Sequence, residues 1–324
     1  MNSNYKYKGM YLFTYAPIGI IGPLIGQYLK SIGFSGTQIG TITALGTGAS
    51  ILAGIMWGKI YANCEDGRIV VFFLCIMSAI VGYISSLTTV FFIYTILYAI
   101  MYFFQQPVMA LTDAMVIGDG KEFSSIRLWG SAGYASSTFI AGKVCEAYGL
   151  DKIFFLYAIT FVIGGLFVIS TNKQKKVVVK EDRIKTDKIS FLHLLEEKKA
   201  IKLIICGFFI FGTNVANNTY FGFLFNDGGG TVAGIGLVFL LMVGSEVPFM
   251  ALTPKFVKIF SMERLIAISI LISILRFTWY STGPSYQSLL WTFFLQGMVN
   301  GVLLVEYIRY IFKVINIRLI GIAI

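Results

Sequence analysis

The chain has 324 residues, of which 56% are hydrophobic and 13% are charged, and its formal net charge is +10. A soluble domain is about a quarter charged, so this composition excludes a water-soluble globule and predicts a membrane protein. Because the basic residues lie between apolar stretches and do not form one stripe, we interpret them as a topology signal and expect no nucleic-acid partner.

Apolar runs, each near the roughly twenty residues that cross a bilayer, follow one another along the chain. We predict ten spanning helices, at residues 9–29, 37–61, 69–87, 90–115, 127–146, 153–171, 200–225, 231–253, 264–282 and 286–310. The expected fold class is therefore an all-α, polytopic membrane protein built as two pseudo-symmetric helical bundles.

A polar segment divides these spans into two groups. Ten of the 26 lysine and arginine residues lie between Lys173 and Lys202. We expect an N-terminal six-helix bundle at residues 1–172, a basic linker at 173–199, and a C-terminal bundle at 200–324 with four helices and the beginning of a fifth. Because Lys and Arg stay on the inner side in short connections, the N-terminus and the linker should face the cytoplasm of a multi-pass protein in the cell membrane.

The two halves resemble each other in sequence, which is typical of transporter folds. Lys59 and Arg68 are separated by the same nine positions as Lys255 and Arg264. A second echo pairs residues 126–130 with 317–321. If this pairing holds, the second half is about two helices shorter than the first. We interpret the chain as a fragment or truncated copy in preference to one whose missing helices come from a partner.

Three motifs resemble a known family. They are GPL at residues 22–24, SIRLWGSAGY at 125–134 and GSEVPF at 244–249. These runs resemble the branch of the major facilitator superfamily that groups lactose-permease-like, nucleoside and phenylpropionate proton symporters. The resemblance covers essentially the whole chain and implies twelve helices with alternating access around a central cavity. Residues 59–63 lack the Asp usual in the superfamily's loop between spans two and three, so a weaker inner gate is expected.

Ionisable side chains within the predicted spans are candidates for proton coupling. Each costs about 2.5 to 3.5 kcal/mol at bilayer depth, so it should face inward. We expect Glu246 to bind the transported proton and Arg276 to stabilise its charged form when the two approach. The structural alternative is a fixed ion pair between them. Glu306 is a further candidate, although an ordinary pair with Arg309, three positions on, explains it equally well.

Amide and phenol side chains within the spans are candidates for the substrate cavity, because they offer donors and acceptors suited to hydroxyl-rich solutes. The same groups also join membrane helices to one another. The candidates are Tyr15 in the first span, Gln106 in the fourth, Asn214, Asn217 and Asn218 in the seventh, and Gln296 and Asn300 in the tenth.

Three charged residues near the inner ends of spans are candidates for an inner gate, namely Asp113, Arg127 and Arg68. Solvated loop charge is the alternative explanation for them. The four cysteines show no metal-ligand spacing and the single His193 lies in the linker, so we expect no metal, no bound cofactor and no enzymatic activity.

The sequence therefore predicts a monomeric secondary transporter that uses the proton gradient to take up a small polar organic solute, such as a sugar or a nucleoside. An efflux carrier for apolar compounds and a non-transporting remnant of such a carrier are the alternatives. A membrane enzyme acting on lipid would need a nucleophile and base or a metal set, and neither is found.

Overall fold

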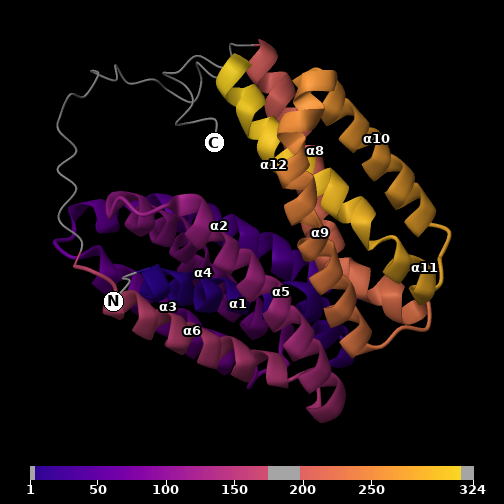
Figure 1. The fold of residues 1–324 in the computed structure, drawn as a ribbon. Helices are drawn as coiled ribbons and strands as arrows, with labels where there is room; N and C mark the ends of the chain where they lie inside the picture. Colours follow the sequence, from indigo (N-terminus) through magenta and orange to yellow (C-terminus); the bar gives the residue numbers. More distant parts are fainter. Residues whose placement is uncertain (1–3, 174–197, 315–324) are drawn as a thin grey trace. The chain divides into compact units, whose positions relative to one another are not determined.

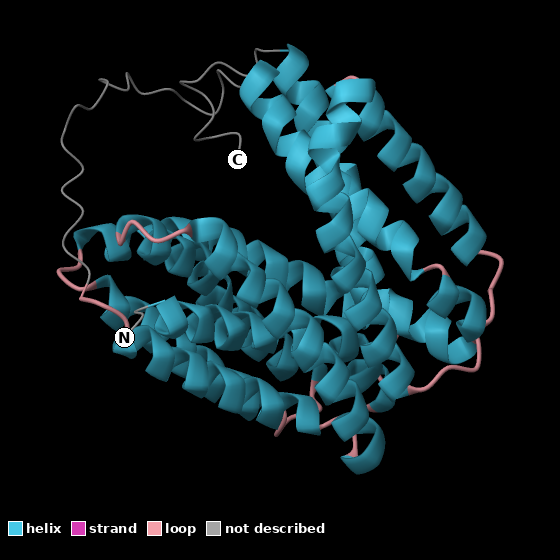
Figure 2. Ribbon diagram, viewed as in Figure 1, coloured by secondary structure: helices cyan, strands magenta, loops and turns pink. Residues whose placement is uncertain are grey.

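A computed structural model describes residues 4–173 and 198–314, and all regular secondary structure within these ranges is helical (Figures 1 and 2). The first six helices are α1 Asn4–Ser31, α2 Gly36–Asn63, α3 Gly67–Ser85, α4 Phe91–Gly118, α5 Phe123–Tyr148 and α6 Lys152–Ser170. After the gap follow α8 Lys198–Asp227, α9 Val232–Ile259, α10 Met262–Tyr280, α11 Tyr286–Trp291 and α12 Phe293–Val314.

These helices confirm the predicted all-α membrane fold. Seven of the described helices are long and apolar enough to cross a bilayer, namely α1 to α4, α6, α8 and α9. The tenth predicted span is divided at Thr292 into the short α11 and the longer α12. Most of the predicted linker, with His193, and the expected beginning of a further span after residue 314 lie outside the described residues.

The described helices form two compact units. The first contains α1 to α6 together with residues 231–240 of α9, and the second contains α8, the rest of α9, and α10 to α12. In the first unit α1 packs against α5 and α6, while α3 packs against α4 and α6. Small residues make these contacts close, since a Cβ added to Gly164 of α6 would lie 3.1 Å from the Phe13 backbone of α1.

The second unit has its own apolar core where α8, α10 and α12 meet. Ile210 of α8, Ile266 of α10, and Val299 and Leu303 of α12 are buried together there. The α10 helix makes its main contact with α12. This packing fixes the helices that carry the buried polar groups of the second half.

The turn between the first two helices has the same local geometry in the two halves. Gly33 after α1 and Gly229 after α8 have φ values of 92° and 89°, which favour glycine, and they lie 196 positions apart. Each turn is followed by a hydroxyl residue, Ser35 or Thr231, whose side-chain oxygen accepts a hydrogen bond from the N–H three positions on. Residues of α1 and α2 therefore match those of α8 and α9 at a spacing of 196.

The spacing falls to 195 from the third helix of each half, because the connection at residues 260–261 is one residue shorter than that at 64–66. The first residues of α3 and α10 are Gly67 and Met262. Arg68 is consequently level with Glu263, and not with Arg264 as the sequence echo indicated.

Candidate functional site

Glu246 of α9 is hydrogen-bonded across the second unit to Asn300 of α12. Its Oε1 accepts a bond of 2.8 Å from the Asn300 amide. Two glycines of α12 allow this approach: a Cβ on Gly297 would overlap the Ser245 hydroxyl, and one on Gly301 would lie 3.0 Å from the Glu246 carbonyl oxygen. The spacing of small residues on α12 thus places an amide beside a carboxylate at bilayer depth.

Arg276 of α10 belongs to a second chain of polar contacts. Its Nη1 donates a hydrogen bond to Gln296 Oε1, and Gln296 Nε2 donates one of 3.4 Å to Asn214 Oδ1 of α8. The Arg276 side chain also stands over the rings of Phe277 and Tyr280, at 4.7 and 5.7 Å from their centroids. One guanidinium therefore joins α10 to α12, and through Gln296 to α8.

Glu246 and Arg276 are each held by an amide and not by each other. No ion pair joins them within the described parts of the chain. Their partners Asn300 and Gln296 lie four positions apart on α12, which places both amides on one helical face. The Arg276 residue is 2% exposed and its Nε and Nη2 have no hydrogen-bond partner in the structure, so the guanidinium keeps donors free in a buried place.

The other candidates of the second half have different surroundings. Glu306 is fully buried, and its Oε1 accepts a 3.0 Å hydrogen bond from Arg309. This is the i,i+3 pair that was the structural alternative to a role of Glu306 in proton coupling. Asn217 is buried with no partner for its Nδ2, while Asn218 is half-buried. Asn214 also donates to the Ile210 carbonyl at 3.0 Å, as polar residues in membrane helices often do.

In the first unit, three side chains surround the carboxylate of Asp113 on α4. Its Oδ1 accepts hydrogen bonds from Tyr11 at 2.5 Å and from Tyr15 at 3.5 Å, both on α1. Arg127 Nε of α5 lies 4.0 Å from the same oxygen, with its guanidinium 4.3 Å from the centre of the Tyr15 ring. Gly130 leaves room for this stacking, because a Cβ there would lie 2.9 Å from Arg127 Nη1.

The structure therefore brings Asp113 and Arg127 together and adds Tyr15, which the sequence suggested for the cavity. Arg68 lies elsewhere: it pairs with Asp66 at 2.7 Å and donates to the carbonyls of Ile169 and Thr171 at the end of α6. Gln106 is half-buried, and its neighbour Gln105 accepts a 2.8 Å bond from Tyr157. The roles assigned to these residues stay predictions.

The sequence suggested Tyr11 and Gln105 as cavity residues, but it did not predict that they would bond Asp113 and Tyr157. The spacing of Tyr11 and Tyr15, one turn apart on α1, is the signal that pointed to Tyr11. Within residues 4–173 and 198–314, no three His, Cys, Asp or Glu side chains are placed together to hold a metal ion.

Two repeated helical units with charged and amide groups buried between their helices define a multi-span membrane transport protein. The chain belongs to the MFS_1 like family, whose model matches residues 4–323, and with it to the major facilitator superfamily.

Known proteins similar to this chain are transporters. The uncharacterized transporter YwbF of Bacillus subtilis (strain 168) is 28% identical over 313 residues, which cover 95% of this chain and 77% of that protein. Maltose permease of Geobacillus stearothermophilus is 26% identical over 307 residues, covering 93% and 76%. The crystal structure of the nucleoside transporter NupG matches with a TM-score of 0.82 at 17% identity, covering 100% of this chain and 85% of that one, and this likeness concerns the fold.

Proposed function

We propose that this transporter takes up a small polar organic solute, a sugar or a nucleoside, together with protons by alternating access. The observation that carries the proposal is the state of Glu246, a carboxyl group at bilayer depth that is bonded to Asn300 and makes no ion pair within the described residues. Such a group costs about 2.5 to 3.5 kcal/mol on insertion scales, so it calls for a functional explanation.

The surroundings of Glu246 suit reversible protonation. An amide donor holds the carboxylate in position, and no salt bridge must break before a proton is taken up. Arg276 is buried on the neighbouring helix with two donors unused, and it supplies a counter-charge when the two side chains approach. Coupling follows because the conformation of the carrier decides whether Glu246 is paired with Arg276 or protonated.

The amides of the second unit provide groups for solute recognition. Asn214, Gln296 and Asn300 form a line of donors and acceptors from α8 to α12, in which Gln296 and Asn300 share one face. Hydroxyl-bearing solutes are bound by amide groups of this kind. The names of two similar proteins, a maltose permease and a nucleoside transporter, agree with a solute of this class.

We infer the location and orientation of the carrier in the membrane from the distribution of charge along the sequence. Lys and Arg gather in the central linker, which supports a cytoplasmic linker and N-terminus in the cell membrane. We expect the carrier to work as a monomer in the bilayer, driven by the proton gradient without a bound cofactor, and to catalyse no covalent reaction.

The test is solute-induced alkalinisation of a lightly buffered suspension of cells that express the chain, screened over sugars and nucleosides. A solute-specific rise in pH that is lost in Glu246→Gln supports the proposal, because glutamine keeps the hydrogen-bond acceptor for Asn300 and removes the titratable group. Binding of the same solute should survive this substitution.

Glu65→Gln provides the matched control, since Glu65 is an exposed carboxylate in the connection between α2 and α3. It should leave the alkalinisation unchanged. A proton signal of full size in Glu246→Gln would overturn the assignment of the proton site, and uptake of a solute with no pH change would overturn symport.

A further inference from the structure

The guanidinium of Arg276 is a positive charge buried among the helices of the second unit. Among the residues described in that unit, Arg276 is the one Lys or Arg that is buried. Arginine stays protonated in proteins, so this charge cannot be removed by the loss of a proton. A buried charge is costly unless it is paired and hydrogen-bonded. Arg276 therefore requires a negative partner.

The two acidic residues within the long helices of this unit have other partners. Glu246 accepts the amide hydrogen bond of Asn300, and Glu306 pairs with Arg309 at 3.0 Å. No ion pair joins either carboxylate to Arg276 in the part of the chain that the structure describes.

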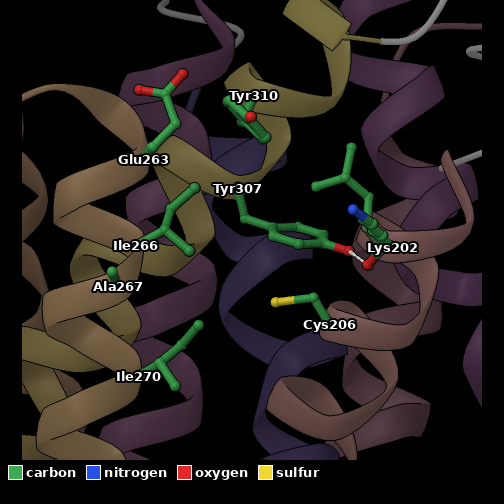
Figure 3. Close-up of a pocket in the computed structure, with 9 residues that line it drawn as sticks. Lys202, Cys206, Glu263, Ile266, Ala267, Ile270, Tyr307 and Tyr310 are labelled. Atoms are coloured by element: carbon green, nitrogen blue, oxygen red, sulfur yellow. Dashed lines mark hydrogen bonds between the residues drawn. The ribbon is translucent and has the colours of Figure 1, made fainter. Parts of the chain in front are cut away.

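The remaining acidic residues described in this unit lie at helix ends. Glu263 is thirteen positions before Arg276 on α10, and Asp227 is thirteen positions after Asn214 on α8, which is about 20 Å along each helix. Figure 3 shows Glu263 in the first turns of α10, at the edge of a cavity that Tyr307 also lines. The described residues of the second unit thus supply Arg276 with no counter-charge at bonding distance.

The donors of Arg276 that remain unused lie on one edge of its guanidinium. Nη1 donates to Gln296 Oε1, whereas Nε and Nη2 have no hydrogen-bond partner among the described residues. In the planar guanidinium, the Nε–H and one Nη2–H point in parallel, at a spacing that matches the two oxygens of a carboxylate. The Gln296 bond and the rings of Phe277 and Tyr280 restrict the orientation of the group. The unused edge is therefore a preformed site for an oxyanion.

We propose that the transported solute carries a carboxylate, which binds the Nε and Nη2 edge of Arg276 while the nearby amides of Gln296 and Asn214 bind its hydroxyl groups. This inference rests on the proposed function, because it names the chemical class of the solute for the same site. One carboxylate balances the single buried positive charge, and a sugar acid combines it with the hydroxyl groups that amides bind. Arg276 is closed to solvent in this structure, so the solute reaches it when the carrier opens.

A solute carboxylate on Arg276 also links solute binding to proton binding. In the proposed cycle, Glu246 uses Arg276 as its counter-charge when the two side chains approach. A bound carboxylate occupies the same donors, so Glu246 is left without that counter-charge and favours its neutral form. The solute anion and the proton then cross the membrane together, with no net charge moved.

The experiment measures binding to the purified full chain in detergent, through the rise in its apparent melting temperature. The probes are glucuronate and acetate, compared with glucose and with chloride at equal ionic strength. We expect a saturable rise with glucuronate that is larger than the rise with glucose. Acetate should give a smaller rise than glucuronate, and chloride should give none.

Two variants test whether the site is the Arg276 edge. Arg276→Lys keeps the charge without the parallel donors, so it should bind glucuronate at least about tenfold more weakly. Gln296→Glu places a carboxylate beside Arg276, so it should raise the melting temperature without any probe and abolish the response to glucuronate. The melting temperature without probe reports whether each variant folds.

Two further variants serve as controls. Arg264→Lys is the same change at an exposed position of α10 and should bind glucuronate as the wild type does. Glu246→Gln removes the competing carboxylate of the protein, so its affinity for glucuronate should not fall.

Four results would overturn the inference. They are an equal rise with glucose, an equal rise with chloride, which indicates an adventitious ion only, no rise with either carboxylate, and glucuronate binding that is unchanged in both Arg276→Lys and Gln296→Glu. The readout does not involve proton movement. Carboxylate binding at Arg276 without alkalinisation would therefore overturn symport alone, and alkalinisation by a neutral solute without carboxylate binding would overturn this inference alone.

Discussion

Glu246 and Asn300 are joined by a 2.8 Å hydrogen bond between α9 and α12, and this bond occupies the carboxylate that the sequence paired with Arg276. The charge of Glu246 is therefore stabilised by an amide in this structure, and Arg276 is bound to Gln296. The ion pair expected as the structural alternative is not formed here. Each of the two charged side chains is instead bonded to an amide of α12.

Removal of this bond should destabilise the second unit. A hydrogen bond to a charged group contributes about 1.5 to 3 kcal/mol, and this contribution is lost when the half-buried Glu246 carboxylate loses its donor. We expect Asn300→Leu to lower the apparent melting temperature of the detergent-solubilised chain and to reduce uptake. Asn218→Leu is the control, because Asn218 is a half-buried amide for which no hydrogen bond is found in the structure. This variant should change stability less. Equal losses in both variants would argue against the Glu246–Asn300 bond.

The close approach of α9 and α12 should be sensitive to a single methyl group. A Cβ at Gly297 would overlap the Ser245 hydroxyl, so Gly297→Ala forces the helices apart. We expect a destabilisation of about 1 to 3 kcal/mol, typical of overpacking, measured as a loss of thermal stability. Gly244→Ala is the matched change, because no other atom lies within 4 Å of a Cβ at that position. If Gly297→Ala were as stable as Gly244→Ala, the packing described here would be wrong.

The contact between Asp66 and Arg68 should make stability depend on pH. The Arg68 hydrogen bond lowers the pKa of Asp66, which caps α3 outside the membrane-spanning segments. A carboxyl whose folded pKa is lowered contributes stability above its unfolded pKa, near 3.9 for a free Asp, and this contribution is lost as the pH falls through the folded value. The wild-type chain should therefore lose thermal stability in acid faster than Asp66→Asn does.

At neutral pH, Asp66→Asn should melt below the wild type, and the two curves should converge in acid. Glu65→Gln, one position earlier and exposed, should follow the wild type throughout. Parallel melting curves for Asp66→Asn and the wild type at all pH values would show that the carboxylate adds nothing to stability.

The positions of the helices follow from the sequence because apolar runs of bilayer length have few alternatives in a membrane. The ends differ by a few residues for a physical reason. Helix α9 runs on to Ile259, beyond the predicted end at residue 253, since Lys255 and Lys258 interrupt the apolar run without interrupting the helix. The break between α11 and α12 at Thr292 could not be predicted from hydropathy, because the apolar run of the sequence continues across it.

The partners of the buried polar groups were less predictable than the groups themselves. The shared face of Gln296 and Asn300 follows from helical spacing, but their partners depend on how closely α12 approaches α9 and α10. Hydropathy does not report this distance. Likewise, the pairing of Arg68 with the end of α6 arises from packing between segments about a hundred positions apart.

The cluster around Asp113 should act as one unit. Asp113 of α4 and Arg127 of α5 meet beside Tyr15 of α1, and each loses its ion-pair partner when the other is replaced. If the contact belongs to a gate, Asp113→Asn and Arg127→Gln should each reduce uptake, and the double variant should be no worse than the more damaging single one, as expected for residues in contact.

The measurement is initial uptake of the solute identified in the alkalinisation screen, normalised to the amount of chain in the membrane. Lys143 is an exposed basic residue on the same helix as Arg127, so Lys143→Gln is the control. Its effect on uptake should add to that of Asp113→Asn. If the losses of uptake in Asp113→Asn and Arg127→Gln simply added in the double variant, the two side chains, 4.0 Å apart, would not be functionally coupled. In that case the two charges would act as independent polar groups at the ends of their helices.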